Sequence, residues 1–242
     1  MAEQERLRTF RHLMKIDLFG HMDKDKLDRL YGDASYLDAY TEHTNQRVKH
    51  DPEQAVGGIW DGIGQLQFQF LLDQGLKPHH RLLDIGCGTL RGGRHFIRFL
   101  DAGCYHGFDL SDQAIAAAKN LVEAELLSDK CPTLYVNREQ NLRFGKSQGR
   151  QFDYLLAQSV FPHLMPDHIN ECFAHIGSVM GPDSRFYFTY QNSEIFRRNG
   201  YKQFSYPYAY FHDLAKHYGF QLFDHSEDYN HPRNQRMLSL SR

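Results

Sequence analysis

The 242-residue sequence lacks a long apolar run, because no stretch approaches the roughly twenty apolar residues that a membrane-spanning helix needs. Its polar opening also lacks the apolar core of a signal peptide. Both absences predict a cytoplasmic protein with no membrane partner. The formal net charge is only −2, so the chain has no general electrostatic attraction for nucleic acid. We therefore expect no DNA partner and favour a small acceptor.

The sequence contains few cysteines, and their spacing does not suggest pairs. The four cysteines show neither CxxC spacing nor a dense framework, which predicts reduced thiols; they are Cys87, Cys104, Cys131 and Cys172. His79 and His80 adjoin the start of a predicted strand, and the other histidines lack the spacing of metal ligands. We expect no metal, and no catalytic triad is evident.

The most informative stretch covers residues 81–93 and reads RLLDIGCGTLRGG. Its apolar run predicts a buried strand, its glycines predict a tight loop, and the apolar spacing that follows predicts a helix. Such a unit places a ligand against the main chain, because glycine has no Cβ to obstruct the approach. Two cofactor classes use it: dinucleotides and nucleosides that carry an amino acid.

The details of this stretch favour the second class. A dinucleotide fingerprint has the form GxGxxG, but here the third glycine, Gly92, comes one position late. Asp84, two residues before the first glycine, suits the ammonium group of an amino acid better than a pyrophosphate. The pattern LLDIGCGT resembles motif I of the class I S-adenosylmethionine (SAM)-dependent methyltransferases. Asp109, in HGFDLS at the end of a second short strand, extends the resemblance.

The rest of the chain alternates between strands and helices, which predicts a doubly wound α/β fold. Strands are expected at 81–85, 105–108, 133–136, 154–158 and 185–190, and helices at 91–101, 111–127 and 166–179. A helix at 210–218 precedes two final strands at 220–223 and 236–240. The resemblance implies a mostly parallel seven-stranded sheet with an antiparallel last strand, formed by residues 55–242 as the SAM-binding domain.

Residues 1–54 lie outside the resemblance. Residues 1–30 predict two short amphipathic helices, a tyrosine-dotted segment to His50 predicts an ordered cap, and Asp51-Pro52 is a plausible domain boundary. The N-terminal region could be a pocket cap or a homodimer surface, since both need an amphipathic helix. A glycine-rich approach at 57–64 then leads to a helix that we expect to begin near Leu66.

The resemblance implies which residues bind the cofactor. Asp84 is expected to hold the methionine ammonium group and Asp109 the ribose hydroxyls. The remaining expected contacts surround the loop or follow the fourth strand: Gly86, Cys87, Gly88, Thr89, Leu110, Gln158 and Ser159. The adenine contact is left open among Asn137, Glu139, Gln140 and Asn141, because the family's usual acidic residue has no clear counterpart there.

Two catalytic candidates lie near the predicted acceptor side. His163 follows the fourth strand and could act as a general base, or it could be a hydrogen-bonded loop residue that shapes the pocket. Tyr190 ends the fifth strand. The segment after it, about 192–211, is dense in aromatic residues and is either a lid for a planar, apolar or cationic acceptor or a second small core.

The predicted function is therefore a SAM-dependent methyltransferase acting on an oxygen or nitrogen atom of a small molecule. The segment SVFPHL replaces the Asx-Pro-Pro-aromatic motif typical of amino-group methylases of DNA and glutamine, and no Pro-Cys pair of the cytosine C5 type occurs there. The alternatives are a protein or RNA acceptor, or a SAM-binding regulatory protein without turnover.

Overall fold

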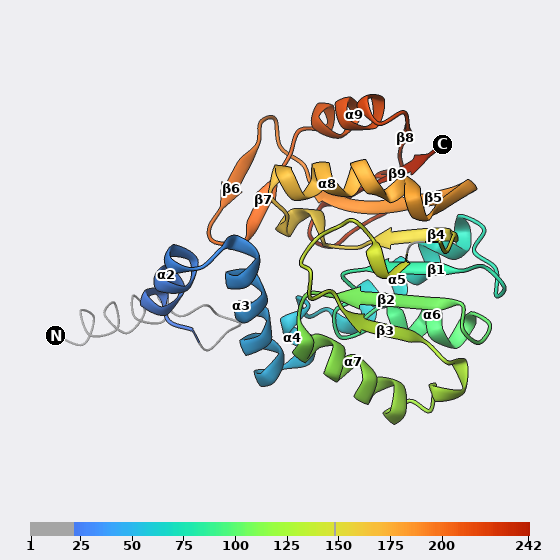
Figure 1. The fold of residues 1–242 in the computed structure, drawn as a ribbon, viewed down its shortest axis with the longest axis horizontal. Coiled ribbons are helices and arrows are strands. Elements are labelled where there is room, and N and C mark those ends of the chain that lie inside the picture. The colour runs from blue at the N-terminus through green and yellow to red at the C-terminus, as the bar shows by residue number, and fades with distance from the viewer. Residues whose placement is uncertain (1–21, 148) are drawn as a thin grey trace.

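A seven-stranded sheet forms the centre of the computed structural model, which describes residues 22–147 and 149–242 (Figure 1). Its strand order is β3-β2-β1-β4-β5-β9-β8. The strands are β1 (Leu82–Ile85), β2 (Tyr105–Asp109), β3 (Thr133–Val136), β4 (Phe152–Ala157), β5 (Met180–Gln191), β8 (Gln221–Asp224) and β9 (Gln235–Ser241). The first five pair in parallel, and β9 is antiparallel to both β5 and β8. The predicted fold class is thus confirmed.

Helices cover both faces of this sheet because its central strands are apolar on both sides. One face packs against α8 (Pro166–Ile176) and α9 (Tyr208–His217) through a phenylalanine-rich core that includes Phe161, Phe173 and Phe188. The other face packs against α5 (Trp60–Asp73), α6 (Gly93–Phe99) and α7 (Asp112–Ala124). Ser111 caps α7 by accepting a hydrogen bond from the Ala114 N–H at 2.9 Å, as the sequence predicts.

Helix α5 begins at Trp60, six residues before the start that the sequence predicts. The glycine-rich approach is therefore partly helical, with Gly62 and Gly64 inside α5. Gly64 allows a close approach to the loop that precedes α6: a Cβ there would lie 2.4 Å from the carbonyl oxygen of Arg91. Packing against this loop overrides the low helix propensity of the two glycines.

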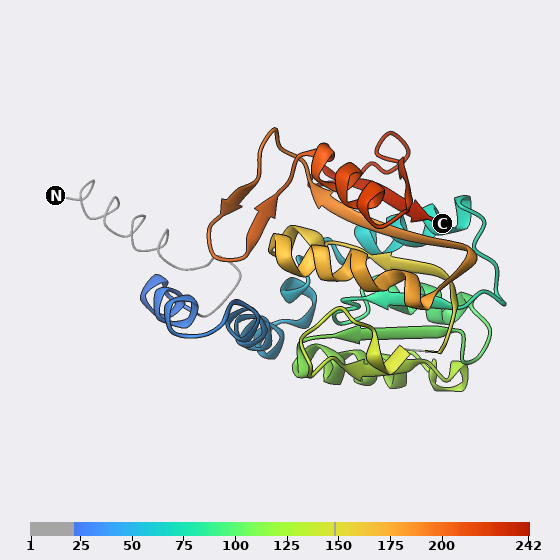
Figure 2. The same cartoon turned by 45° about the horizontal axis from the view of Figure 1, so that its top comes forward.

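The N-terminal part of the described chain forms α2 (Lys24–Asp33), α3 (Tyr36–His50) and the short α4 (Pro52–Ala55). Figures 1 and 2 show α2 and α3 beyond the carboxyl ends of the parallel strands. Asp51 caps α4 and Pro52 is its first residue, while the domain boundary at this point stays a prediction. The first expected amphipathic helix lies outside the described residues, and the homodimer surface stays a prediction.

The segment 192–211 contains a two-stranded hairpin, β6 (Arg197–Asn199) and β7 (Gln203–Ser205), which leans toward α2 and α3 (Figure 2). Phe204, Tyr206 and Phe211 are fully buried and belong to the main core, whereas Phe196 and Tyr208 are exposed, so the segment is part core and part surface. The Tyr201 hydroxyl donates to Asp28 at 2.6 Å and ties the hairpin to α2. No helix within residues 22–147 or 149–242 is long and apolar enough to cross a membrane.

Candidate functional site

A cavity of about 840 Å³ lies at the carboxyl ends of the parallel strands. Its floor comes from the loops that follow β1, β2, β3 and β4. Its walls come from α3, the hairpin loop and the segment before β9, which contribute Tyr40, Lys202 and His231 among others. The volume falls within the roughly 300–1,000 Å³ typical of small-molecule sites.

The glycine loop after β1 has a backbone that only glycine adopts without strain. Gly86 and Gly88 have φ angles of +68° and +55°. Both line the cavity, and a Cβ on either would lie 2.7 Å from a valine methyl group, that of Val160 or Val56. Because neither glycine carries a Cβ, the main chain that follows β1 is accessible from the cavity.

Asp84, on β1, places a buried carboxyl group against the cavity. Its side chain accepts a hydrogen bond from the Tyr105 hydroxyl at 2.6 Å, and the residue is only 4% exposed. Burial raises the pKa of Asp84 to about 7, although the bond from Tyr105 acts in the opposite direction. A cationic ligand group beside this carboxyl would favour its ionised form.

Asp109, at the end of β2, is held by two backbone donors. Gly88 N–H donates to Oδ2 at 3.0 Å and Ser111 N–H donates to Oδ1 at 2.9 Å. Each carboxylate oxygen retains a second lone pair for a ligand hydroxyl. The fixed carboxylate lines the cavity, as do its neighbours Leu110 and Cys87.

Thr89 takes a different place from the rest of the loop. It does not line the cavity; its buried hydroxyl donates instead to the carbonyl oxygen of Pro52 at 3.1 Å. The side chain thus joins the glycine loop to the start of α4. The predicted ligand contact of this side chain is replaced by a structural one.

Gln158 and Ser159 line the cavity just after β4, as the strand order predicts. The Gln158 side-chain oxygen accepts from the Tyr229 hydroxyl at 2.7 Å. Ser159 has φ +58°, its N–H donates to Thr189 Oγ1 at 2.7 Å, and its hydroxyl donates to Gln235 at 3.0 Å. These bonds fix the strained turn at the centre of the cavity floor.

His163 lines the cavity beside the hairpin loop. Its Nδ1 lies 2.6 Å from the carbonyl oxygen of Lys202, which can only accept, so Nδ1 carries the proton. Burial, with a smaller contribution from nearby cations, lowers the pKa of His163 to about 4, although the hydrogen bond to Lys202 acts in the opposite direction. The ring is therefore neutral at pH 7, with an unprotonated Nε2 that can accept a proton.

Tyr190 does not lie at the cavity. Its side chain is fully buried, packs edge-on against Phe211 with ring centroids 4.7 Å apart, and donates to Asn192 Oδ1 at 3.3 Å. The prediction that Tyr190 is catalytic is not supported by this placement. The strand alternation at the end of β5 turns this residue into the core beneath α9.

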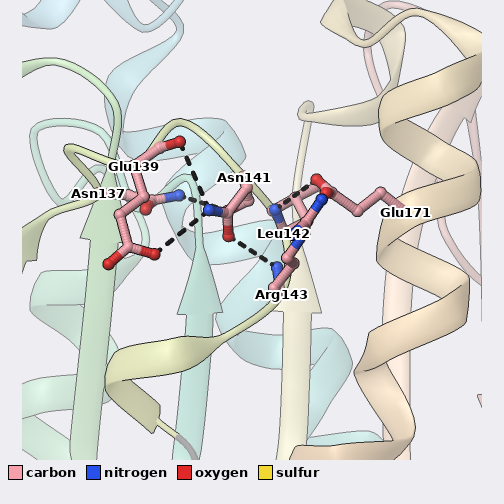
Figure 3. A network of polar contacts seen from close by, with 6 residues as sticks. All are labelled: Asn137, Glu139, Asn141, Leu142, Arg143 and Glu171. Atoms are coloured by element: carbon pink, nitrogen blue, oxygen red, sulfur yellow. Dashed lines mark hydrogen bonds and ion pairs between the residues drawn. The ribbon is translucent and has the colours of Figure 1, made fainter.

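The loop after β3 forms a polar network that supports another part of the cavity floor (Figure 3). The Asn137 amide donates to the carbonyl oxygen of Asn141 at 2.7 Å, and the Asn141 amide donates to the carbonyl oxygen of Glu139 at 3.4 Å. Glu171 of α8 accepts from the backbone N–H of Leu142 at 2.9 Å. Asn137, Gln140 and Asn141 line the cavity, so three of the four adenine-contact candidates remain at the site.

Several cavity residues have no recognisable sequence signal. Tyr40, Thr44 and Arg47 come from the polar helix α3, and His231 and Arg233 come from the turn before β9. Only folding brings these segments beside the glycine loop. The spacing of apolar residues predicts helices and strands but not which of their polar side chains meet.

Two buried polar atoms beside the glycine loop have no hydrogen-bond partner within the part of the chain that the structure describes: Arg91 Nε and His231 Nε2. His231 Nδ1 accepts from the Arg233 N–H at 3.2 Å, so in the neutral ring Nε2 carries the proton. Burial lowers the pKa of His231 to about 4, which keeps the ring neutral. Both residues line the cavity and offer it N–H donors.

Comparison with known proteins agrees with this geometry. Residues 83–186 match the family described as "Methyltransferase domain". The chain is similar to magnesium protoporphyrin IX methyltransferase from Synechocystis PCC 6803, solved with bound SAM (17% identity, 93% of this chain and 94% of that chain, TM-score 0.59).

Two further solved structures share the fold. One is a SAM-dependent methyltransferase from Leishmania major (12% identity, 90% of this chain and 89% of that chain, TM-score 0.64). The other is phosphoethanolamine N-methyltransferase 2 from Haemonchus contortus, in complex with phosphomonomethylethanolamine and S-adenosylhomocysteine (17% identity, 86% of this chain and 60% of that chain, TM-score 0.63). Residues 83–186 thus match a methyltransferase domain, and the solved structures share the fold of the chain.

Proposed function

We propose that this chain is a class I SAM-dependent methyltransferase and that it transfers the methyl group to an oxygen or nitrogen atom of a small molecule. One observation carries the proposal. A single cavity extends from Asp84 and Asp109 at the glycine loop to His163 and is walled by α3 and the hairpin loop. Such a cavity can hold a cofactor and a small acceptor together.

The residues of the glycine-loop end suit SAM. The buried Asp84 carboxyl can pair with the methionine ammonium group, and the fixed Asp109 carboxylate can accept from the ribose hydroxyls. The unpartnered donors Arg91 Nε and His231 Nε2 suit a carboxylate, since leaving a buried donor unsatisfied costs about 1–3 kcal/mol. The ammonium group of SAM would pair with the Asp84 carboxylate, and its carboxylate would accept hydrogen bonds from Arg91 Nε and His231 Nε2.

The chemistry that SAM supplies when bound is an activated methyl group on sulfur. The protein then needs to align the acceptor, exclude water and receive a proton where the acceptor loses one. His163 suits the last task, because it lines the cavity and the hydrogen bond to Lys202 leaves its Nε2 unprotonated. This supports the base interpretation over a purely structural role.

The walls favour a small acceptor over a macromolecular one. Tyr40 and Lys202, from α3 and the hairpin loop, close over the same cavity, with the Lys202 ammonium 5.8 Å from the centre of the Tyr40 ring. A protein side chain or an RNA base would have to enter between these elements. Salt-dependent RNA binding would support the macromolecular alternative.

The test is titration of SAM by calorimetry into wild type, Asp109→Ala and the exposed control Asp112→Ala, followed by an acceptor screen for S-adenosylhomocysteine (SAH) release. We expect the wild type and the control to bind alike, and Asp109→Ala to bind at least about tenfold more weakly, since a charge-assisted hydrogen bond contributes about 1.5–3 kcal/mol. Absence of SAM and SAH binding to the wild type would refute the proposal. Binding without turnover of any small acceptor would favour the regulatory or macromolecular alternative.

A further inference from the structure

Helix α3 contacts both ends of the cavity, and we infer that two of its residues, Tyr36 and Asn45, are positioning residues that orient His163 in response to the cofactor. This inference rests on the proposed methyl transfer and specifies how that site is regulated. Tyr36 bonds to the backbone of His163, whereas Asn45 bonds to the residue that holds the Asp109 carboxylate. The base is therefore aligned when the cofactor side of the cavity is occupied.

The orientation of His163 depends on groups from other parts of the chain. The Tyr36 hydroxyl of α3 donates to the His163 carbonyl oxygen at 2.7 Å, and the carbonyl oxygen of Lys202, in the hairpin loop, lies 2.6 Å from Nδ1. The Tyr40 ring lies against the imidazole, with ring centroids 5.7 Å apart. Burial raises the pKa of Tyr36 far above its ordinary value, so its hydroxyl remains a donor. Helix α3 and the hairpin therefore determine where Nε2 points.

Helix α3 is also bonded to the cofactor side of the cavity. The hydroxyl of the fully buried Ser111 donates to Asn45 Oδ1 at 2.6 Å, while the Ser111 N–H donates to the Asp109 carboxylate at 2.9 Å. Ser111 thus joins α3 to the carboxylate proposed to accept from the ribose hydroxyls. Gln140, in the loop after β3, donates to Asp38 of the same helix at 2.9 Å. Helix α3 is therefore joined to the loops after β2 and β3 as well as to the loop after β4.

The helix can carry a displacement from one end of the cavity to the other because it is rigid. Tyr36 and Asn45 lie about 13 Å apart along its axis, at about 1.5 Å per residue. Beyond α4, Gly57, Gly58 and Ile59 have φ angles of +100°, +60° and +47° and connect the unit to α5. Such a short left-handed segment can absorb the change in backbone angles when α3 and α4 pivot together.

A cofactor in the cavity contacts α3 as well as the floor, so it favours the closed position of the helix. Tyr40 and Thr44 of α3 line the cavity. Burial and the nearby Asp109 charge raise the pKa of Tyr40, so this phenol lies near the carboxylate proposed to bind the ribose. A ligand that bridges the two surfaces binds the closed arrangement more tightly and shifts the equilibrium toward it. By linkage, a ligand at His163 raises the affinity for the cofactor by the same factor.

The hairpin formed by β6 and β7 is held by the same N-terminal helices. Phe204 packs edge-on against Tyr36 with ring centroids 5.5 Å apart, and the Arg198 guanidinium lies 6.0 Å from the centre of the Tyr36 ring. The Tyr201 hydroxyl donates to Asp28 of α2 at 2.6 Å. The expected cofactor contacts belong instead to the loops after β1, β2 and β4. A response of the hairpin to the cofactor would therefore report the movement of α3.

The test asks whether SAH binding alters His163 and the hairpin, and whether both responses depend on α3. Calorimetry gives the affinity for SAH, ¹³C-labelled histidine reports the His163 ring, and amide hydrogen exchange reports residues 197–205. The spectrum of His163→Gln assigns the resonance. In the wild type, saturating SAH should shift the His163 resonance and slow exchange in the hairpin at least about fivefold, since couplings between sites are typically about 5- to 150-fold.

Two variants separate the two ends of α3. Asn45→Ala removes the acceptor of the Ser111 hydroxyl, so with SAH bound at saturation both the His163 shift and the slowing in the hairpin should be lost. Tyr36→Phe keeps the ring that packs against Phe204 and removes only the hydroxyl. We therefore expect this variant to lose the His163 response, to retain the slowing in the hairpin, and to bind SAH within about twofold of the wild type.

Asn45→Asp keeps an oxygen acceptor for Ser111 and should restore both responses. Gln46→Ala is the matched control, because the Gln46 side chain bonds to Glu42 of the same helix at 2.6 Å, and it should behave as the wild type. Wild-type protein that binds SAH without either response would overturn the inference. So would unchanged responses in Asn45→Ala, or their loss in Gln46→Ala. Absence of SAH binding to the wild type would instead refute the proposed function.

Discussion

At the scale of single residues, the site depends on ionisable groups whose protonation states are displaced by burial. Asp84 holds a carboxyl group with a pKa of about 7, whereas His163 and His231 have pKa values of about 4. All three shifts have the same cause: burial disfavours the charged form. Each group is therefore largely uncharged or close to its titration point before a ligand arrives.

Affinity for SAM should depend on pH through Asp84. The ammonium group of SAM pairs with the ionised carboxylate, so binding releases a proton below pH 7, and affinity rises by up to about tenfold per pH unit from pH 5 to pH 7. Calorimetry in buffers of different ionisation enthalpy measures the proton release. Asp84→Asn should bind weakly with a flat profile, whereas the exposed control Asp101→Asn should follow the wild type. A flat wild-type profile would contradict this assignment.

The reaction should require neutral His163. Because the pKa of this ring is about 4, kcat/KM in the free enzyme should fall only as pH drops toward 4, and not near the ordinary histidine value of about 6.5. His163→Gln should lower kcat by about 10²- to 10⁴-fold without weakening SAH binding. The exposed control His217→Gln should retain wild-type kcat. An unchanged kcat in His163→Gln would leave this histidine a structural role only.

Sequence alone predicted the placement of the site residues that belong to local units of the fold. Asp84, the glycine loop and Asp109 belong to strand–loop–helix units a few residues long, so their placement follows from the local pattern. Tyr190 was misplaced because strand alternation puts it on the same face as Phe186 and Phe188, in the core beneath α9. Thr89 was misplaced because its partner, Pro52, lies 37 positions away.

At the scale of elements, the junction between α5 and the loop before α6 positions Arg91. The Arg91 Nη1 donates to the carbonyl oxygens of Val56 at 2.7 Å and Gly58 at 3.3 Å, while α5 lies against its backbone at Gly64. The sequence predicted both helices but began α5 too late, because glycine lowers helix propensity and the packing that requires glycine is not visible in the pattern.

Gly64→Ala should therefore destabilise the protein. The added Cβ would lie 2.4 Å from the Arg91 carbonyl oxygen, a backbone atom that cannot move freely, and we expect a loss of about 1–3 kcal/mol in the free energy of unfolding. Gly62→Ala, two residues earlier in the same helix, meets only a methyl group of Ile59 at 3.1 Å and should be neutral or stabilising by up to about 1 kcal/mol. Denaturant unfolding compares the two. Equal effects of the two substitutions on the free energy of unfolding would show that the close approach at Gly64 does not determine the stability.

At the scale of the whole molecule, the sheet and the cavity are one structure. The doubly wound strand order brings the loops after β1, β2 and β4 together at the carboxyl ends of the strands. There α3 and the hairpin loop complete the cavity. The alternation of strands and helices was enough to predict the sheet. It was not enough to predict the walls, since α3 and the turn before β9 are linked to the site only by tertiary contacts such as Ser111 to Asn45 at 2.6 Å.

Cofactor binding should stabilise the entire chain. SAH at one hundred times its dissociation constant contributes about 2.7 kcal/mol, which corresponds to a rise of roughly 5–10 °C in Tm for a chain of this size. Amide hydrogen exchange should slow in α3, which contributes Tyr40, Thr44 and Arg47 to the cavity, and stay unchanged in α9, which contributes none. Protection confined to the loops after β1 and β2 would contradict a role for α3 as a wall.

The antiparallel strand β9 has a consequence for how the protein is made. Gln235, its first residue, lines the cavity and accepts hydrogen bonds from Ser159 at 3.0 Å and Thr189 at 2.8 Å, while β9 itself separates β5 from β8. A ribosome-bound chain that has already exposed the glycine loop still lacks this support and the neighbouring His231. The nascent polypeptide therefore stays without a complete pocket until β9 has paired with β5.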